Sequence, residues 1–504
     1  MSVRPAVLLT LVLFGCQEEP PDTGDTGPVD ADQDGWTVGE GDCDDADPDV
    51  HPEAEEICGD GVDNNCNGSA DGCGLWGDVS LAEAGARLDG EGDLDLAGDA
   101  LTFVQDLTGD GHPDLVVGGA DRSASVYLVS GLDVQSASLS EADAILRGSG
   151  TTGSAVADGG DLNQDGSDEL LAGEPGGVYV ISGPLSGEQP IGDVSVYLVG
   201  DADDNAGTSV AGGRDVSGDG LPDLVVGARF ADDGGVDAGM AYILYGPILE
   251  PKTLEEADAS LRGEDARDLA GLPVALAGDV DGDGIGDVLV GAEGAAAHGK
   301  WTGAAYLVLG PIKGLVDLSD ADARIPGEDE RTSTGAALAG LGDLDGDGRD
   351  EFAVAAPSGD GEAADSGVVY VFLDPPQGSA TVADAQVRID GVQGGENAGS
   401  SLAAGDVDGD GVRDLLAGAP RHSADEEWAG GAYLVYGPLQ QSGTFALSGA
   451  VLLGEAYNEV AGCAVASGTD LDADGYDEVL VGASQYGGAG DYEGAVYLLY
   501  GGTP

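Results

Sequence analysis

The sequence predicts an all-β fold, a seven-bladed β-propeller of four-stranded blades, preceded by a small cysteine-rich module. Three observations lead to this prediction. A nine-residue acidic loop occurs seven times, successive copies begin 54 to 64 residues apart, and four short apolar segments accompany each copy. Seven repeats of four short strands are typical of a propeller, and a β-helix or a linear array of repeats is the alternative.

The nine-residue loop has the chemistry of a calcium site. In the copies that begin at Asp279 and Asp406, side-chain oxygens stand at positions 1, 3 and 5, Gly at position 6 and a carboxylate at position 9. Alternate residues of a tight loop can converge on one point, and hard oxygen ligands suit Ca2+. Zinc would require clustered Cys or His. A solvated acidic turn without an ion is the alternative, which seven copies make a poor explanation.

The loop differs from an EF-hand, which closes with Glu at position 12 between helices. Here position 12 is Val290 or Val354, inside a short apolar run with the pattern of a strand, so the acid at position 9 is expected to close the site. The side-chain ligands expected at positions 1, 3, 5 and 9 are, loop by loop, Asp106, Thr108, Asp110 and Asp114; Asp161, Asn163, Asp165 and Glu169; Asp215, Ser217, Asp219 and Asp223; Asp279, Asp281, Asp283 and Asp287; Asp343, Asp345, Asp347 and Glu351; Asp406, Asp408, Asp410 and Asp414; and Asp470, Asp472, Asp474 and Glu478.

The amino terminus has the features of an export signal. Residues 1–15 combine Arg4 with an apolar run too short to cross a bilayer, and they end in Leu13-Phe14-Gly15 before Cys16. This ending resembles a bacterial lipobox, which implies cleavage before Cys16 and acylation of its thiol; an ordinary secretory peptide is the alternative. We therefore expect a protein of the bacterial cell envelope, at the outer membrane or cell surface, that contacts the membrane through this anchor alone. Residues 16–29 form a flexible tether.

Residues 30–73 form a separate small module. Asp30, Asp32 and Asp34 begin one more cation loop, which suggests an eighth Ca2+. Four cysteines follow, which in an exported protein favour two disulfides over zinc: Cys43, Cys58, Cys66 and Cys73. Three pairings of these cysteines are possible. The segment resembles an Asp/Cys-rich metal-binding motif found beside repeats in environmental bacteria and, less closely, thrombospondin type 3 repeats.

Residues 74–504 contain the repeats. In the sixth repeat, strand A (401–405) enters the acidic loop, strand B (414–418) leaves it, strand C (431–436) follows a variable loop, and strand D (451–454) ends the blade. A D-like segment at 86–90 precedes the first strand A, whereas the last repeat stops after its strand C at 495–500. The amino-terminal segment is therefore predicted to complete the last blade, which removes an exposed strand edge.

Residues 86–500 resemble the FG-GAP repeats of integrin α-subunit propellers. The Gly-Ala-Pro element is intact at Gly418-Ala419-Pro420, while the Phe-Gly element is mostly Ala-Gly or Thr-Gly, as at Ala206-Gly207 and Thr334-Gly335. The resemblance implies about seven Ca2+ in the propeller and adds the backbone carbonyl at position 7 to the ligands: His112, Ser167, Leu221, Ile285, Arg349, Val412 and Tyr476. Thr108, Asn163 and Ser217 replace Asp at position 3, so the first three sites are expected to be weaker.

The composition limits the partners. Acidic residues number 96 and basic residues 17, giving a net charge of −79, which excludes nucleic acid as a partner. No catalytic constellation is visible: the chain shows no nucleophile elbow and no phosphate-binding glycine loop, and Cys463 is expected to be a buried, inert thiol. The chain is therefore predicted not to be an enzyme.

Binding is the favoured function. In such a blade the B–C and D–A connections lie on the face opposite the acidic A–B loops. The long B–C loops carry aromatic and His side chains as candidate contacts, namely Phe230, His298, Trp301, His422, Trp428, Tyr486 and Tyr492. We expect adhesion or recognition of an extracellular protein or carbohydrate through this face. A structural cell-surface scaffold without a specific ligand is the second possibility, and a polysaccharide hydrolase or lyase is the third.

Overall fold

The computed structural model describes residues 75–502 except residues 93, 120–123, 132–133, 297–300, 424–427 and 488–491, together with residues 36, 43, 48, 50 and 51. The chain divides into two units, Met1–Gly72 and Cys73–Pro504. In the first unit, Cys43 is disulfide-bonded. The remaining predictions for the amino-terminal region lie outside the described residues: Cys16, Asp30, Asp32, Asp34, Cys58, Cys66 and Cys73.

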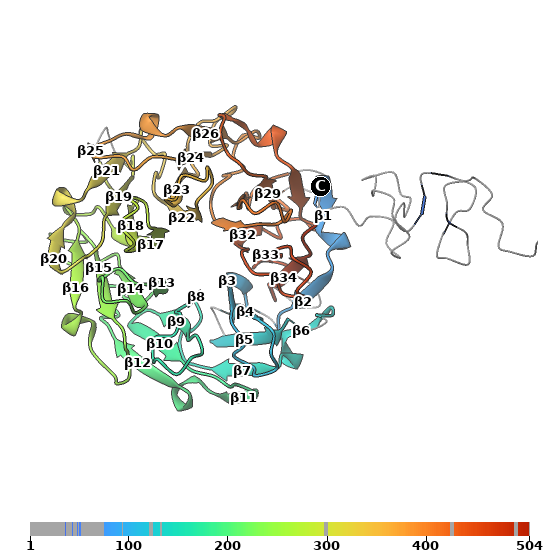
Figure 1. Ribbon diagram of the computed structural model, residues 1–504, viewed down its shortest axis with the longest axis horizontal. Coiled ribbons are helices and arrows are strands. Elements are labelled where there is room, and N and C mark those ends of the chain that lie inside the picture. Colours follow the sequence, from blue (N-terminus) through green and yellow to red (C-terminus); the bar gives the residue numbers. More distant parts are fainter. Residues whose placement is uncertain are drawn as a thin grey trace, which may run out of the picture. The chain divides into compact units, whose positions relative to one another are not determined.

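The second unit is the predicted seven-bladed all-β propeller, with seven sheets arranged as a ring in chain order (Figure 1). We number blades and acidic loops 1–7 along the chain. Strands A to D of blades 1–3 are β3 (Ala97–Val104), β4 (Asp114–Gly119), β5 (Ser125–Ser130) and β7 (Ala144–Arg147); β8 (Ala155–Asp158), β9 (Leu170–Glu174), β10 (Gly177–Ile181) and β12 (Ser195–Val199); and β13 (Ser209–Arg214), β14 (Asp223–Ala228), β15 (Met240–Tyr245) and β16 (Ala259–Arg262).

The remaining four blades repeat this order. Their strands are β17 (Ala270–Gly278), β18 (Asp287–Ala292), β19 (Ala304–Val308) and β21 (Ala323–Pro326); β22 (Ala337–Gly342), β23 (Glu351–Ala356), β24 (Val368–Phe372) and β26 (Val387–Asp390); β27 (Leu402–Gly405), β28 (Asp414–Gly418), β29 (Gly431–Val435) and β31 (Ala450–Leu453); and β32 (Ala461–Ala466), β33 (Val479–Ala483), β34 (Ala495–Leu499) and β2 (Ala86–Asp89).

The closure of the ring is confirmed. Strand β2 pairs antiparallel with β34, with Ala86 opposite Leu498 and Asp89 opposite Ala495, so it supplies strand D of blade 7. The preceding strand β1 (Gly77–Ser80) pairs in parallel with β31 of blade 6. Figure 1 shows both blue strands among the red strands of the last blades. One amino-terminal segment therefore joins blades 6 and 7.

A fifth, short strand covers the outer edge of most blades, and the sequence did not predict it. It pairs in parallel with strand D and comes from the C–D connection of the next blade, except in blade 6, where it comes from the amino-terminal segment before β2. In blades 1, 3, 4, 5, 6 and 7 this strand is, respectively, β11 (Gly187–Pro190), β20 (Gly314–Asp317), β25 (Gly378–Ser379), β30 (Gly443–Thr444), β1 and β6 (Ala137–Ser138). Blade 2 has four strands, with one isolated bridge between Val199 and Thr253 at this edge.

A 3-10 turn follows each of these connections and buries one apolar side chain between blades. The seven turns are η2 (Leu81–Glu83), η3 (Leu139–Glu141), η4 (Ile191–Asp193), η5 (Leu254–Glu256), η6 (Leu318–Asp320), η7 (Val382–Asp384) and η8 (Phe445–Leu447). In all seven turns the first residue is buried, as Leu81 and Phe445 illustrate. Among the described residues, no helix is long and apolar enough to cross a membrane.

Close backbone contact between blades explains the glycines of the repeat. A Cβ on Gly227, in strand β14, would lie 1.8 Å from the carbonyl oxygen of Gly271 in blade 4. Gly173 has the same relation to Gly207, at 1.9 Å, and Gly207 has a φ of 97°. Because only glycine tolerates both the contact and the backbone conformation, the blades can pack closely without the missing Phe.

Candidate metal centres and ligand face

Each acidic loop is an A–B connection held between two antiparallel strands. The acid at position 9 begins strand B in five blades and directly precedes it in blades 2 and 7. All seven of these acids are buried. The position-9 carboxylate is turned into the loop, because Asp114 accepts the N–H of Leu107 and Asp287 accepts that of Val280.

The loops use backbone N–H groups to orient their carboxylates. In loop 4, Gly284 N–H donates to Asp279 at 2.9 Å, and Val280 N–H donates to Asp287 at 2.7 Å. Loop 6 repeats both bonds, with Gly411 N–H donating to Asp406 at 2.9 Å and Val407 N–H to Asp414 at 2.8 Å. Asp287 and Asp414 also accept a bond at their other oxygen, from Gly310 N–H and Gly437 N–H respectively, each at 2.8 Å, so the backbone defines the orientation of these carboxylates.

Loops 4–7 bring their remaining oxygens together. Ligand-type oxygens lie within 4.8 Å of one another in four clusters: Asp279, Asp281 and Asp287; Asp343, Asp345, Asp347 and Glu351; Asp406, Asp408 and Asp414; and Asp470, Asp472, Asp474 and Glu478. Each cluster contains one buried oxygen without a hydrogen-bond partner: Asp279 Oδ1, Glu351 Oε1, Asp406 Oδ1 and Glu478 Oε1. An unpaired buried carboxylate oxygen is costly, and a bound cation would satisfy it. The residues present therefore fit a divalent cation, and we call these loops the carboxylate loops.

Loops 1–3 differ because the residue at position 3 is a hydrogen-bond donor, so we call them the donor loops. Thr108 Oγ1 donates to Asp114 Oδ1 at 2.9 Å, and the Asn163 amide donates to Asp165 at 3.0 Å and to Glu169. Ser217 Oγ donates to Asp215 at 3.2 Å. These bonds engage carboxylate oxygens that would otherwise be available to a cation.

Burial and neighbouring acids raise the pKa of the position-9 carboxyl groups. The main cause is loss of solvation, followed in the carboxylate loops by the negative charges at positions 1 and 3. The pKa of Asp114 and of Asp223 is raised to about 6, that of Asp287 and of Asp414 to about 7, and that of Glu478 to about 8. In donor loop 2 the pKa of Glu169 is also raised to about 7, so the position-9 carboxylates of both classes are poorly compensated without a cation.

On the opposite face, three exposed aromatic residues occupy equivalent positions in different blades. Trp301, Trp428 and Tyr492 each stand two residues before the glycine that precedes strand C, with exposed fractions of 51%, 47% and 44%. Their φ angles are 62°, 58° and 59°. Asp237 and Asp365 adopt the same left-handed conformation at this position of blades 3 and 5, so the conformation belongs to the repeated turn, and the exposed rings are what distinguish blades 4, 6 and 7.

Both tryptophans line cavities between blades. Trp301 lines a cavity of about 530 Å³ with Arg331, Ser333 and Ser358. Trp428 lines one of about 790 Å³, together with Gln393, Arg421, Asn458 and Gln485. An aromatic ring beside amide and guanidinium groups can contact both the apolar and the polar faces of a ligand.

Other candidate residues of this face are less available. His422 is only 6% exposed, its Nδ1 hydrogen-bonds with Glu396 at 2.7 Å, and it also contacts Tyr433. The prediction that His422 is a surface contact is therefore wrong. Phe230 and Tyr486 are half-buried, and each ring is covered by a guanidinium, from Arg229 and Arg87 respectively. His298 lies outside the described residues.

Cys463 is partly exposed and lines the Trp428 cavity, so the expectation of a fully buried residue is not met, although its sulfur lies against backbone oxygens. Its sulfur lies 3.5 Å from the carbonyl oxygen of Gly98 and 3.4 Å from that of Gly482, to which it donates. Burial raises the pKa of this thiol to about 11, which keeps it protonated and unreactive at neutral pH.

A repeated tyrosine was not singled out from the sequence. Strand C of every blade carries one at the same position: Tyr127, Tyr179, Tyr242, Tyr306, Tyr370, Tyr433 and Tyr497. Several donate to acids of a neighbouring D–A loop, including Tyr433 to Glu396 at 2.8 Å and Tyr497 to Glu459 at 2.6 Å. These acids also accept backbone N–H groups of their own loops. The sequence contained a signal for these tyrosines, because one occurs in each of the seven predicted C strands.

The fold and the loops define a class of protein, a seven-bladed propeller with acidic cation-type loops in its A–B connections. Family comparison is consistent with this class. The FG-GAP repeat matches residues 206–244, 334–372, 398–435 and 461–499, and an FG-GAP-like repeat matches residues 106–172. A "Putative metal-binding motif" matches residues 42–72. The chain is thus an FG-GAP repeat propeller with an amino-terminal metal-binding motif, as the sequence resemblance implied.

Relatives with known names cover parts of the chain. It is 31% identical to integrin alpha pat-2 of Caenorhabditis briggsae over 42% of this chain and 18% of that protein. It is 27% identical to phosphatidylinositol-glycan-specific phospholipase D of Rattus norvegicus over 68% of this chain and 45% of that protein. Among solved structures, BBS1N in complex with ARL6DN matches with a TM-score of 0.49 and 12% identity, over 84% of this chain and 97% of that one. The chain spans less than half the length of both named relatives.

These relatives bear on function at a coarse level. An FG-GAP propeller that resembles integrin α domains suggests adhesion or recognition. The phospholipase match covers less than half of that enzyme, so its activity is not transferred to this chain. That the chain is not an enzyme stays a prediction.

Proposed function

We propose that this protein is a calcium-stabilised recognition protein of the bacterial cell envelope. Its propeller is held by Ca2+ on the A–B face and binds an extracellular protein or carbohydrate on the opposite face. The observation that carries the proposal is the coincidence of four acidic clusters with one unpaired buried oxygen each. Ca2+ is the expected cation because every ligand is an oxygen from a flexible loop.

The donor and carboxylate loops would hold Ca2+ with different strengths. The four carboxylate loops supply tight sites, and the three donor loops supply weaker ones, because a donor at position 3 competes for the same oxygens. Calorimetric titration of the chelated protein tests this. We expect about four tight sites in the propeller, and an absence of calcium binding would contradict the proposal.

The face opposite the metal loops is the proposed ligand face. Its two exposed tryptophans line cavities, whereas the acidic loops on the other face are constrained by metal geometry. Truncating an aromatic anchor typically costs about 2 kcal/mol or more, or roughly thirtyfold in affinity. The variant Trp301→Ala/Trp428→Ala should lose binding on glycan and protein arrays while keeping its calcium-dependent melting.

A matched control separates this role from general damage to the face. Val236 lies in the B–C connection of blade 3, is 60% exposed and is not among the residues lining the two tryptophan cavities, so Val236→Ala removes exposed apolar surface elsewhere on the same face. It should bind as the unaltered protein does. Undiminished binding by the folded double-tryptophan variant would place the ligand site elsewhere on the propeller.

The membrane anchor is proposed to be Cys16. Metabolic labelling with a palmitate analogue should tag the protein, and Cys16→Ala should abolish the tag. A label that persists in Cys16→Ala would show that another residue is acylated. The expected location is the outer membrane or cell surface, with no other membrane contact.

A further inference from the structure

A recurring ion pair joins the outer parts of adjacent blades. At four blade boundaries the residue two positions after strand D is Glu, and an Arg from strand D of the next blade reaches it. The pairs are Arg147–Glu91 at 2.6 Å, Arg324–Glu264 at 2.9 Å, Arg388–Glu328 at 3.4 Å and Arg87–Glu455 at 3.4 Å. A guanidinium therefore lies between the blades at each of these boundaries, next to the repeated tyrosine of strand C.

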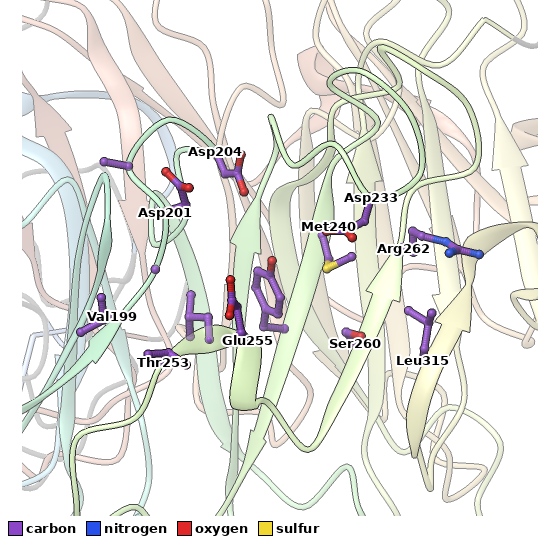
Figure 2. A pocket seen from close by; sticks show the side chains of 14 residues that line it. Val199, Asp201, Asp204, Asp233, Met240, Thr253, Glu255, Ser260, Arg262 and Leu315 are labelled. Carbon is purple, nitrogen blue, oxygen red and sulfur yellow. The ribbon is translucent and has the colours of Figure 1, made fainter.

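The boundary between blades 2 and 3 has the acid but lacks this guanidinium. Asp201 stands two residues after β12, and Arg262 ends β16 as Arg147 ends β7. Arg262 instead donates to Asp317 of β20 at 2.7 Å. Figure 2 shows its guanidinium directed away from Asp201 and Asp204. Ser260 occupies the strand position that holds Arg in blades 4, 5 and 7.

A cavity of about 740 Å³ lies at this boundary (Figure 2). Its lining includes four carboxylates, the side chain of Arg262, the ring of Tyr242 and the buried side chains of Met240 and Leu254, so its acidic groups outnumber its one basic group. The acids are Asp201, Asp204, Asp233 and Glu255. Burial and these neighbouring negative charges raise the pKa of Tyr242 to about 12. Within the described part of the chain, the convergent metal-type clusters are all in the A–B loops, so the cavity suits an extended organic cation better than a metal ion.

The strand beside the cavity also has an edge without a regular fifth strand, where Val199 N–H donates to the carbonyl oxygen of Lys252 at 2.9 Å and a partner segment would pair with the residues before Val199. Strand β12 is the D strand without a fifth strand, and Val199, at its end, lines the cavity. The fifth strands β1, β11, β20 and β25 begin with a glycine at a φ of 63° to 68°, and Glu250 followed by Pro251 replaces this glycine in the connection that would cover β12. A residue before proline favours extended backbone, so Glu250 does not adopt the left-handed conformation with which the glycine begins the other fifth strands. The connection therefore does not form a regular fifth strand.

We propose that this cavity binds the arginine side chain of a partner protein, presented from an extended segment that pairs with β12. The guanidinium would take the place that the chain's own arginines fill at four other boundaries. The negative charge of the cavity complements it, and the strand edge supplies backbone hydrogen bonds, as in β-strand addition. The site is separate from the tryptophan cavities, and the proposal is independent of the proposed function.

The probe is a fluorescein-labelled, acetylated and amidated peptide, Ser-Thr-Arg-Thr-Val, titrated by anisotropy into the full chain in saturating Ca2+ and physiological salt. Citrulline in place of arginine keeps the shape and removes the charge, and it should weaken binding about tenfold or more. Asp201→Asn/Asp204→Asn should weaken binding of the arginine peptide to a similar extent. The matched control Glu362→Gln/Asp365→Asn removes two acids from a loop of blade 5 and should leave the affinity unchanged.

A second variant tests the site by filling it. Ser260→Arg places an arginine at the strand position of Arg324, where it can pair with Asp201, so it should raise the melting temperature and block the peptide. Equal binding of the citrulline peptide would overturn the proposal, as would unchanged affinity in both Asp201→Asn/Asp204→Asn and Ser260→Arg. Trp301→Ala/Trp428→Ala should not affect this peptide, which distinguishes failure here from failure of the proposed ligand face.

Discussion

The donor loops of blades 1–3 and the carboxylate loops of blades 4–7 have the same length and share the hydrogen bond from the position-6 N–H to the position-1 carboxylate. They differ at position 3, whose N–H donates to the position-9 carboxylate in the donor loops. In loop 1, Thr108 donates to the position-9 carboxylate, whereas in loop 5 Asp345 adds a further negative charge to the cluster around Glu351. Loop 5 retains a buried oxygen without a partner, and loop 1 does not. In the donor loops the side chain and the N–H group at position 3 both satisfy carboxylate oxygens, whereas each carboxylate loop leaves one buried oxygen that a cation could satisfy.

Removing calcium from the whole protein should have the largest effect. At about 100 times Kd, each occupied site adds about 2.7 kcal/mol to the free energy of unfolding. Four tight sites would then add about 10 kcal/mol, and chelation should lower the melting temperature by about 10 °C or more. Calorimetry with and without excess chelator measures this, and an unchanged transition would show that neither class of loop needs an ion.

The pH dependence should distinguish the calcium-free protein from the bound one. The folded-state pKa of Asp287 is raised to about 7 and that of Glu478 to about 8, so these groups bind protons more tightly in the folded than in the unfolded chain. The stability of the chelated protein should therefore fall as the pH rises from about 4 to about 8, by a few kcal/mol in total.

With calcium present the dependence on pH reverses. Protons compete with Ca2+ for the same carboxylates, so calcium-induced stabilisation should grow over the same pH range. Chemical denaturation at several pH values, with chelator or with Ca2+, measures the slope of the free energy of unfolding against pH in each condition. Parallel slopes would mean that the position-9 carboxyl groups are not the calcium ligands.

A single substitution at position 3 should separate the two classes of loop. Asp345→Ser gives loop 5 the residue found in loop 3, and should remove one tight site and about 2 to 3 kcal/mol of calcium-dependent stability. Ser217→Ala, at the same position of loop 3, should leave the number of tight sites unchanged. Calorimetric titration of both variants measures this difference, and equal losses would show that position 3 does not define the classes.

The converse substitution should give the smallest effect. Ser217→Asp supplies loop 3 with the missing carboxylate and should add one tight site while making the chelated protein slightly less stable. The expected gain is about 1 to 2 kcal/mol in saturating Ca2+, because the surrounding loop is not otherwise adapted to the extra charge. If this variant gains no site, loop 3 differs from loop 4 in more than its position-3 residue.

The sequence predicted the parts of this fold that are encoded locally. Loop spacing and the short apolar runs indicated seven blades, and the unmatched segments at 86–90 and 495–500 indicated how the ring closes. The fifth strands were missed because they have two to four residues and pair in parallel with segments from another blade. So short a strand has no detectable period.

For the acidic loops and the ligand face, the sequence predicted which residues are present but not which of them contact one another. The lack of a carboxylate at Thr108, Asn163 and Ser217 indicated weaker cation binding. That these side chains also donate hydrogen bonds to neighbouring carboxylates is visible only in the structure. The exposure of Trp301 and Trp428 agrees with their assignment to the ligand face, but His422 is buried because it pairs with Glu396 of the preceding D–A loop. Likewise, nothing in the sequence indicates that Arg262 turns to Asp317 instead of Asp201.

The amino-terminal closure has a mechanical consequence. Strand β1 pairs with blade 6 and strand β2 with blade 7, and just ahead of them the ring of Trp76 stacks on Tyr436 with centroids 6.2 Å apart. Any pulling force transmitted through the residues that precede Leu75 therefore reaches the seam of the ring before it reaches the interior of a blade. If the proposed anchor at Cys16 and the proposed ligand face are both right, tension between them loads this seam first, and the force that ruptures the seam limits the tension that the propeller withstands.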